Sequence, residues 1–554
     1  MNLLLISSIA MPYNEVEAIL EEKSILRIPT VAMPIGLMEM GAYVREKSCI
    51  SNIQILDCGK EMGSFYINKE KLSSRSYQHF LRSLLDKVEF TPDVVGISLM
   101  FACARKSSLE TAEIAKEKWK NCTTILGGNT ATGMYKKLLD EECVDYVVRG
   151  EGELSLTEFI NSLNDSIKNI NVQGVYDKVK ASRGVEEISP MIEDLDELPM
   201  PAFDLLDLDF YCNTPFYGRG SVMFSRGCPF KCTFCGSSLV HGRRVRHKSN
   251  KKCLSEVKYL LDYGFKHIKP EDDIWAIRKK KFMELADEIA KIRGNCLFEL
   301  SQGLSVAVMD EERIDAMMRM GVKGAQLAIE SGSPYIQKHI IKKNVNLDKA
   351  KKLLDYMRKV GFVAEVNFIF GFPGETDAMR KESIEYMKSL DVNWIYVFNC
   401  APIPGTELFK EFEKVADMDS VDWDNMRVGR RLFDTIEITT EELENIAYDT
   451  NIEINFFNNC NMRNGRYELA IQCWNEIILN NYPFHTVGRY CRAIAYSKLK
   501  RMDDATADLR ICVDWIRKNS ESKRLFERYR AKMPLLEKLM ENEKGFNLAS
   551  ELVR

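Results

Sequence analysis

Short apolar runs alternate with helical patterns along the first 415 residues, and this alternation restricts the possible folds more than any other feature. In residues 1–165 the apolar runs lie at 3–6, 53–56, 94–99, 123–126 and 144–148. Apolar strands separated by helices predict an α/β protein with a parallel, doubly wound (Rossmann-like) sheet, which binds ligands beyond the carboxyl ends of its strands. Residues 216–415 continue the pattern with runs at 221–224, 267–269, 297–301, 324–329, 363–370 and 394–399. This second series predicts a full or partial β/α barrel.

Composition excludes several classes of protein. With 554 residues, 45% of them hydrophobic, the chain is long enough for three to four domains. The net charge is −4 and there is no long basic run, so nonspecific binding to nucleic acid is not expected. No apolar run reaches the roughly 18 residues needed to cross a bilayer, so no membrane association is expected. Sixteen scattered cysteines are typical of reduced thiols, which predicts a cytoplasmic location.

The boundaries follow from changes in pattern. We expect a first domain at 1–165, a linker at 166–215, the barrel at 216–415 and a helical domain at 416–554. The linker is acidic and contains Pro199 and Pro201, as surface connections often do. In the last domain, two similar segments place Ala470 and Ala505 35 residues apart, which resembles a tetratricopeptide repeat. Such helices could bind a peptide or protein partner, or equally could cover the barrel mouth.

Three cysteines stand close together just after the first apolar run of the barrel. Cys228, Cys232 and Cys235 are spaced Cys-x3-Cys-x2-Cys. A closed metal site uses four protein ligands, whereas three leave one coordination position open for a small molecule. Two alternatives are free thiols and a zinc site completed by His241 or His247.

This spacing, with Phe234 just before the last cysteine, resembles the signature of radical S-adenosylmethionine (SAM) enzymes. The resemblance implies that Cys228, Cys232 and Cys235 hold a [4Fe–4S] cluster and that SAM binds its fourth iron. It further implies that an external one-electron reductant, of the flavodoxin or ferredoxin type, drives cleavage of SAM to a 5′-deoxyadenosyl radical.

Polar segments at the predicted strand ends extend the resemblance. It implies that Glu271 and Asp272 contact the methionyl amino group of SAM, and that Glu330 and Ser331 hold its ribose or amino acid. Ile369 and Gly371, together with Phe234, would lie beside the adenine. Acidic residues at strand ends also cap helices, so each position has a plain structural alternative. One departure is Asn367, which replaces the first glycine of the family's Gly-x-Ile-x-Gly pattern.

The first domain resembles the cobalamin-binding domain that precedes many radical SAM barrels. The resemblance rests on segments 34–37, 127–132 and 147–153. It implies that cobalamin lies against the strand-end residues Ser98, Gly127, Gly128, Asn129, Thr130, Gly150 and Glu151. The Asp-x-His-x-x-Gly motif is absent and His79 is the domain's one histidine, so we expect no axial histidine ligand from this domain. The alternative is a Rossmann-like scaffold that has lost its ligand.

The resemblance predicts a cobalamin-dependent radical SAM methyltransferase. It would methylate an unactivated carbon, or phosphorus, of a small natural product or peptide by means of methylcobalamin and the 5′-deoxyadenosyl radical. One alternative is a radical SAM cyclase, ring-contracting enzyme or oxidoreductase without methyl transfer. Another is a non-catalytic metal-binding protein that binds partners through its helical tail. The sequence identifies neither the substrate nor a catalytic side chain.

Overall fold

Strand β1 (Asn2–Ser7) sends successive side chains into two different cores. The computed structural model describes residues 1–21, 31–68, 76–165, 167, 170–214, 218–300, 302–427 and 429–541. In this structure, Leu3 and Leu5 pack into one core, and Leu4 and Ile6 pack into another. Side chains alternate along a strand, so an unbroken apolar run produces a sheet that is buried on both faces.

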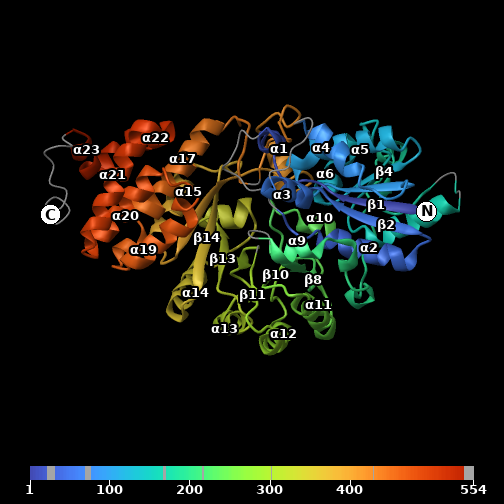
Figure 1. Cartoon of the computed structure of the whole chain (residues 1–554), viewed down its shortest axis with the longest axis horizontal. Helices are drawn as coiled ribbons and strands as arrows, with labels where there is room; N and C mark the ends of the chain where they lie inside the picture. Colours follow the sequence, from blue (N-terminus) through green and yellow to red (C-terminus); the bar gives the residue numbers. More distant parts are fainter. Residues whose placement is uncertain are drawn as a thin grey trace.

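The first sheet has the strand order β2-β1-β3-β4-β5-β6. The bounds are β2 Asn52–Asp57, β3 Val94–Ser98, β4 Thr123–Gly127, β5 Tyr146–Val148 and β6 Val175–Tyr176. β1 to β5 are parallel, while β6 pairs antiparallel with β5. Helices flank both faces: α1 Tyr13–Leu20, α2 Ile35–Lys47, α3 Cys58–Asn68, α4 Tyr77–Leu85, α5 Arg105–Lys118, α6 Asn129–Leu139 and α7 Glu153–Asn164 (Figure 1). The doubly wound sheet is therefore present as predicted.

The segment expected to be a surface linker is integrated with the first sheet. It supplies β6 and the short helices α8 (Lys178–Ser182) and α9 (Leu208–Asn213). Leu195 and Leu198 are buried in a small cluster with Tyr43 of α2. The acidic composition predicted a surface position, but the leucines between the acidic residues bury themselves against the sheet.

A second set of parallel strands forms an open barrel. β7 (Gly220–Val222), β10 (His267–Pro270) and β11 (Leu297–Phe298) make one arc. β12 (Leu304–Ser305), β13 (Gly324–Glu330), β14 (Val363–Phe370) and β15 (Trp394–Asn399) make the other. Among the described residues, one bridge between Phe298 and Val322 joins the arcs. Of the predicted third strand at 297–301, only 297–298 is a strand, and residue 301 lies outside the described residues. An antiparallel hairpin, β8 (Ser225–Arg226) and β9 (Arg246–His247), follows β7.

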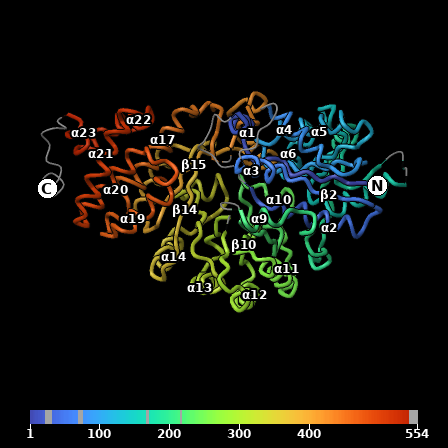
Figure 2. The backbone as a smooth tube through the Cα atoms, viewed as in Figure 1, coloured from blue at the N-terminus to red at the C-terminus, as the bar shows by residue number. Residues whose placement is uncertain are grey.

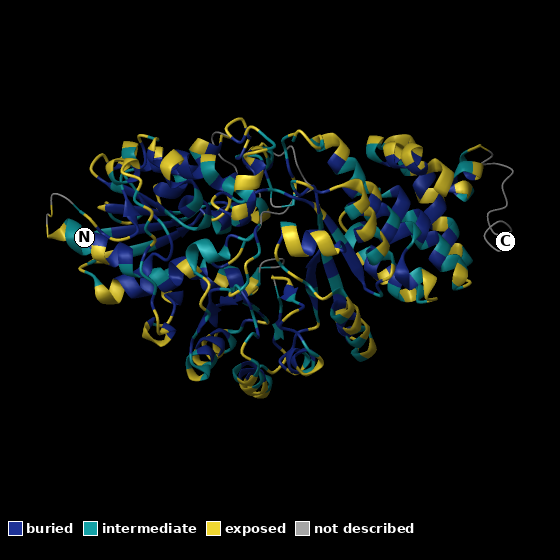
Figure 3. Cartoon of the chain, turned by 180° about the vertical axis from the view of Figure 1, so that it is seen from behind, coloured by how far each residue is buried: buried dark blue, intermediate teal, exposed yellow. Residues whose placement is uncertain are grey.

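Helices line the outside of the barrel. They are α11 Asn250–Tyr263, α12 Lys279–Ile292, α13 Glu311–Arg319, α14 Leu347–Val360 and α15 Asp377–Lys388. α11 to α14 form a row along one side in Figure 2, and their inward faces are buried in Figure 3. The partial β/α barrel expected from the alternation is thus present.

The remaining chain is helical and has its own core. α16 (Glu407–Phe412) packs into a core of the first sheet. The helical region contains α17 Thr440–Ile452, η5 Glu453–Phe457, α18 Cys460–Arg463, α19 Tyr467–Trp474, η6 Asn475–Leu479, α20 Thr486–Lys498, α21 Met502–Lys518, α22 Ser520–Tyr529 and α23 Pro534–Glu541. Trp474, Ala493 and Ala505 are fully buried in this core. The small alanines let the helices approach closely around the tryptophan. None of the described helices is long and apolar enough to cross a bilayer.

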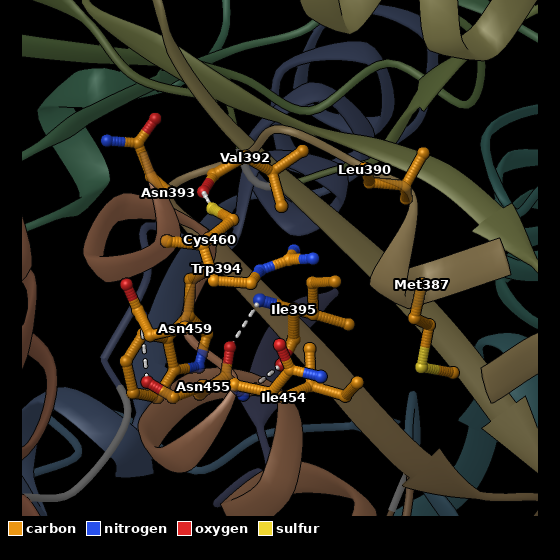
Figure 4. Close-up of a pocket in the computed structure, with 12 residues that line it drawn as sticks. Met387, Leu390, Val392, Asn393, Trp394, Ile395, Ile454, Asn455, Asn459 and Cys460 are labelled. Atoms are coloured by element: carbon orange, nitrogen blue, oxygen red, sulfur yellow. Dashed lines mark hydrogen bonds between the residues drawn. The ribbon is translucent and has the colours of Figure 1, made fainter. Parts of the chain in front are cut away.

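Two asparagines attach this helical region to the edge of the barrel. Asn455 accepts a hydrogen bond from the N–H of Ile395 in β15 and donates one to its carbonyl, at 3.0 and 2.7 Å (Figure 4). Asn451, one turn earlier, makes the same pair of bonds to Val397, at 3.2 and 3.0 Å. These side-chain amides occupy the hydrogen-bonding positions of a further strand, so β15 is not left as an open edge.

Candidate active site

The loop that carries the three cysteines is held by backbone contacts on both sides. The N–H of Gly227 donates to Asp273 at 2.7 Å, and the N–H of Cys228 donates to the carbonyl of Gly242 at 3.2 Å. At the other end, the N–H of Thr233 donates to the carbonyl of Ile341 at 3.1 Å. Gly227 has φ 92°, and a Cβ there would lie 2.3 Å from the carbonyl oxygen of Arg244. Only glycine fits this turn.

Cys228, Cys232 and Cys235 are half-buried free thiols whose electrostatic effects overlap. Burial raises the pKa of Cys228, and it raises the pKa of Cys232 to about 11. The neighbouring thiol of Cys235 raises the pKa of both further. The thiols are therefore near one another in a site that favours their neutral form. A bound cation would reverse this preference, because metals bind the thiolate.

The predicted zinc alternative finds no support among the described residues. His241 Nδ1 lies 2.6 Å from a carboxylate oxygen of Asp273. Burial and the cations Arg278 and Lys281 lower the pKa of His247 to about 4, so this ring faces basic residues. Across the described parts of the chain, no three His, Cys, Asp or Glu side chains converge as ligands of a metal ion. A [4Fe–4S] cluster would need only the three cysteines of the loop as protein ligands.

Three consecutive carboxylates follow β10 and do different things. Asp272 is 1% exposed and accepts hydrogen bonds from the hydroxyl of Ser225 and the N–H of Phe224. Burial raises its pKa to about 7. Glu271 is contacted by Lys269 at 3.1 Å and by Gln302 at 3.0 Å. Asp273, which the sequence did not single out, supports the cysteine loop.

Glu330, Phe234 and Cys232 meet around one lysine. Lys343 Nζ lies 2.8 Å from Glu330 Oε1 and 5.9 Å from the centre of the Phe234 ring. Burial raises the pKa of Cys232, whereas the positive charge of Lys343 lowers it and Glu330 opposes the lysine. The structure therefore places the end of β13 beside the cysteine loop. No sequence signal pointed to Lys343.

Ser331 makes hydrogen bonds to neighbouring residues of the protein. Its hydroxyl lies 3.1 Å from that of Ser383 and accepts a hydrogen bond from the N–H of Ser333 at 3.1 Å. Its carbonyl accepts from Gln337 at 2.7 Å. These contacts shape the turn after β13, and the ligand role of Ser331 stays a prediction.

The end of β14 combines a glycine at positive φ with buried charged side chains. Gly371 has φ 85°, its N–H donates to Glu375 and its carbonyl accepts from Arg431 at 3.2 Å. Burial raises the pKa of Glu375 to about 7. Ile369 and Phe234 are both half-buried beside one large apolar cluster, and their contact with adenine stays a prediction. The buried Oδ1 of Asn367 has no hydrogen-bond partner in the structure, so a ligand could satisfy it.

The strand-end residues of the first sheet form one loop-lined edge. Gly128 has φ 105°, and a Cβ there would lie 2.8 Å from the carbonyl oxygen of Leu99. Thr130 donates to the carbonyl of Met100 at 3.0 Å, and the N–H of Gly150 donates to Thr132 at 3.1 Å. Three further predicted residues lie at the same edge, two at strand ends and one beginning α6: Ser98, Gly127 and Asn129.

Asn129 brings the two halves of the predicted site together. A Cβ on Gly236, the residue after Cys235, would lie 2.9 Å from the side-chain amide of Asn129. The Oδ1 atom of Asn129 is buried without a hydrogen-bond partner in the structure. One turn along α6, a Cβ on Gly133 would lie 2.2 Å from the carbonyl oxygen of Pro404, after β15. The ligand edge of the sheet thus faces the barrel mouth, with an unsatisfied acceptor at the junction that fits a polar cofactor.

Glu151 is engaged in a buried ionic network instead of facing this edge. Arg246 contacts both of its carboxylate oxygens, and Arg226 lies 3.3 Å from it. Burial opposes its ionisation, but the bonds from Arg246 and the charge of Arg226 outweigh burial and lower the pKa of Glu151. A cofactor contact of Glu151 therefore competes with two arginines. The predicted role remains untested for this residue.

The network continues across the boundary between sheet and barrel. Arg226 also contacts Glu39 of α2 and Glu153 of α7, each at 2.5 Å. Lys248 lies 2.6 Å from both Glu39 and Glu256. No sequence pattern predicted this set, because its members are spread over more than 200 residues. Arg226 stands two residues before Cys228, so the network connects the first domain to the cysteine loop.

Comparison with known proteins agrees with this geometry. A model of the radical SAM superfamily matches residues 222–387, and a model of the B12 binding domain matches residues 26–160. A Pyrococcus horikoshii protein named as an uncharacterized methyltransferase is 31% identical over 394 residues, which cover 70% of this chain and 80% of that protein. The chain belongs to the cobalamin-binding radical SAM enzymes. The family predicted from the sequence, and its cofactors SAM, a [4Fe–4S] cluster and cobalamin, are confirmed.

Two further matches bear on this radical SAM enzyme. The cytidylyl-2-hydroxyethylphosphonate methyltransferase of Streptomyces wedmorensis is 28% identical over 427 residues, covering 69% of this chain and 78% of that protein. The structure of the cobalamin-dependent SAM radical enzyme OxsB with aqua-cobalamin bound is also similar, with a TM-score of 0.62 and 14% sequence identity. The match covers all of this chain and 83% of the OxsB chain. The second likeness shows that the described residues share this fold, including those of the helical tail.

Proposed function

We propose that this enzyme transfers a methyl group from SAM, through cobalamin, to an unactivated carbon or a phosphorus atom of a small natural product or peptide. The observation that carries the proposal is the packing of Asn129 against Gly236, which brings the predicted ligand edge of the first sheet beside the cysteine loop. The names of the relatives in Pyrococcus and Streptomyces support methyl transfer. When bound, cobalamin supplies a carrier for the methyl group and the cluster supplies the electron that cleaves SAM.

The chain's own residues bind and orient the reactants. Cys228, Cys232 and Cys235 would ligate three irons. Lys343 holds the Glu330 side chain beside the cysteine loop through their ion pair, where a carboxylate can hold the ribose or amino group of SAM. Phe234 and Ile369 would enclose the adenine.

Residues of the first sheet would form the cobalamin surface. Glycines at 127, 128 and 150 keep the edge free of side chains, so that a flat macrocycle can approach the backbone. Asn129 can present its unsatisfied oxygen to that ligand. Enclosing the substrate between this edge and the barrel mouth would exclude water from a reactive radical.

The test is anaerobic reconstitution of the full chain with iron, sulfide and hydroxocobalamin, followed by SAM and a reductant. We expect about four irons and one cobalt per chain, release of 5′-deoxyadenosine, and S-adenosylhomocysteine only when cobalamin is present. Cys235→Ala should lose iron and both products. Cys212→Ala, a half-buried cysteine outside the loop, is the matched control and should keep them.

Two outcomes would contradict the proposal. Iron without cobalt, with deoxyadenosine as the one product, would indicate a radical SAM enzyme without methyl transfer. Zinc without sulfide would indicate a non-catalytic metal protein.

A further inference from the structure

Two short basic segments, far apart in sequence, meet on one surface beside the cysteine loop. Residues 243–252 contain six lysines and arginines and no acidic residue, and residues 278–281 are all basic. Arg278 donates to the carbonyl of Val245 at 3.4 Å, and Asn250 donates to the carbonyl of Lys281 at 3.2 Å. Between them lies an open cleft of about 640 Å³, lined by Ser249, Asn250, Arg278, Lys279, Lys280, Lys281 and Glu284. We call these two segments the basic surface.

Five basic side chains of this surface make no ion pair with the described residues. Four others are paired: Arg246 and Lys248 lie in the buried ionic network, Arg244 pairs with Glu193, and Lys279 pairs with Asp310 and Glu312. Within the described part of the chain, no carboxylate lies at ion-pair distance from five other basic residues: Arg243, Lys251, Arg278, Lys280 and Lys281. The whole chain carries a net charge of −4, so this surface is a local reversal of its overall charge. Unpaired cations gathered on one surface attract an anionic partner.

The basic surface begins at the cysteine loop itself. Arg243 is exposed and donates to the carbonyl of Phe230, between Cys228 and Cys232. Its neighbour Gly242 accepts the hydrogen bond from the N–H of Cys228. A protein bound here therefore stands one hydrogen bond away from the backbone of the predicted cluster ligands.

We propose that the basic surface is the docking site of an acidic one-electron carrier of the flavodoxin or ferredoxin type. The inference rests on the proposed radical chemistry, in which each SAM cleavage consumes one electron. The carrier is oxidised by one electron and the cluster is reduced by one. That electron then breaks the C5′–S bond of SAM, which gives methionine and the 5′-deoxyadenosyl radical.

The charge pattern suits such a carrier better than a tight partner. Electron-transfer complexes bury small areas, below about 1,200 Å², and depend on charge complementarity for fast association. Five unpaired cations on a surface of this kind give steering without a large apolar contact. Because the charges are exposed, salt should weaken the association strongly, since the screening length falls to about 8 Å at 0.15 M.

The experiment compares two reductants on the reconstituted full-length enzyme. Lys251→Glu with Lys280→Glu reverses two exposed charges in the first turns of α11 and α12, where acidic residues suit a helix. We expect reduction of the cluster by flavodoxin hydroquinone to slow by about tenfold or more at low salt, as for loss of electrostatic steering. Reduction by dithionite should not change. In the unmodified enzyme, the flavodoxin rate should fall as salt rises from 50 to 400 mM.

The matched control reverses Lys351 and Lys352, two exposed lysines on α14, and should leave both rates unchanged. An unchanged flavodoxin rate in the Lys251→Glu/Lys280→Glu variant would overturn the proposal. So would an equal loss with dithionite, or tight binding of an oligonucleotide to this surface with normal flavodoxin kinetics. If the unmodified enzyme fails to cleave SAM with dithionite, the proposed function fails; if it cleaves SAM but the surface has no effect, only the docking site fails.

Discussion

Glu330 has φ 70°, a backbone region that non-glycine residues seldom occupy. It follows a bulge between β13 and β14, which changes the register at the strand end. The bulge and the unusual backbone direct its carboxylate to Lys343 and the cysteine loop. Strained residues held in place by their surroundings are frequent at ligand sites.

Glu330→Gln should therefore weaken SAM binding. A hydrogen bond to a charged group contributes about 1.5–3 kcal/mol, which corresponds to roughly a 10- to 100-fold rise in the dissociation constant. Equilibrium dialysis with the reconstituted enzyme measures this change. Glu365→Gln, on β14 but well before the strand end, should leave SAM affinity unaltered. Equal affinities for both variants would show that Glu330 does not contact SAM.

Asp272 predicts a pH effect on stability. Its pKa rises from 3.8 to about 7 on folding because of burial. Between those values the unfolded chain loses the proton and the folded chain keeps it, so stability falls as pH rises. Relative to the natural enzyme, Asp272→Asn should gain stability from about pH 4 to pH 7, by up to about 1.4 kcal/mol per pH unit, and change no further above pH 7.

Thermal unfolding of the two proteins without SAM or cluster, at pH 5, 6, 7 and 8, measures the difference. A constant difference in melting temperature across this range would contradict the raised pKa.

At the scale of elements, the helix formed by α17 and η5 completes the barrel. Asn451 and Asn455 lie one turn apart and satisfy the backbone groups of alternate residues on β15. The helical tail therefore serves the barrel directly. A tetratricopeptide-like role in partner binding remains a prediction for the helices beyond it.

Asn455→Ala should destabilise the enzyme strongly, because Asn455 is buried and pairs with the edge of β15. It would leave the buried N–H and carbonyl of Ile395 without partners, and each unsatisfied group costs about 1–3 kcal/mol. Chemical denaturation, together with hydrogen exchange at β15, measures the loss. Asn480→Ala, at an exposed position of the same helical region, is the control and should change stability by less than about 0.5 kcal/mol. Similar small effects of both variants would refute the edge-capping role.

At the scale of the whole molecule, the buried ionic network fixes the first sheet against the barrel. Buried ion pairs add little net stability, but they specify one arrangement, because a misplaced charge stays unpaired. Here the arrangement specified is the one that sets the predicted ligand edge of the first sheet beside the cysteine loop.

Glu39→Ala would remove the carboxylate shared by Arg226 and Lys248. Breaking one partner out of a buried pair costs about 3–5 kcal/mol. We expect faster hydrogen exchange in both α2 and β8, and a loss of cobalamin affinity that exceeds any loss of iron. Glu46→Ala, an exposed residue of α2, should show neither effect. Unchanged exchange in β8 would mean that the network does not join the two domains.

The sequence alone determined those features that depend on local pattern. The alternation of apolar runs and helical patterns is enough to predict two parallel α/β domains, because consecutive apolar residues indicate a strand that is buried on both faces. The cysteine loop was equally clear, since its three ligands lie within eight residues. Strand-end glycines and carboxylates could be named for the same reason.

The tertiary structure decided what depends on contacts between distant residues. Glu151 looked like a strand-end ligand, yet Arg246, 95 residues later, engages its carboxylate. Lys343 carried no signal until folding set it between Glu330 and Phe234. The sequence analysis did not predict the basic surface, because its two segments are short. They form one positively charged surface only when α11 and α12 lie side by side in the folded chain. Charge acts through space, so sequence spacing alone could not predict these partners.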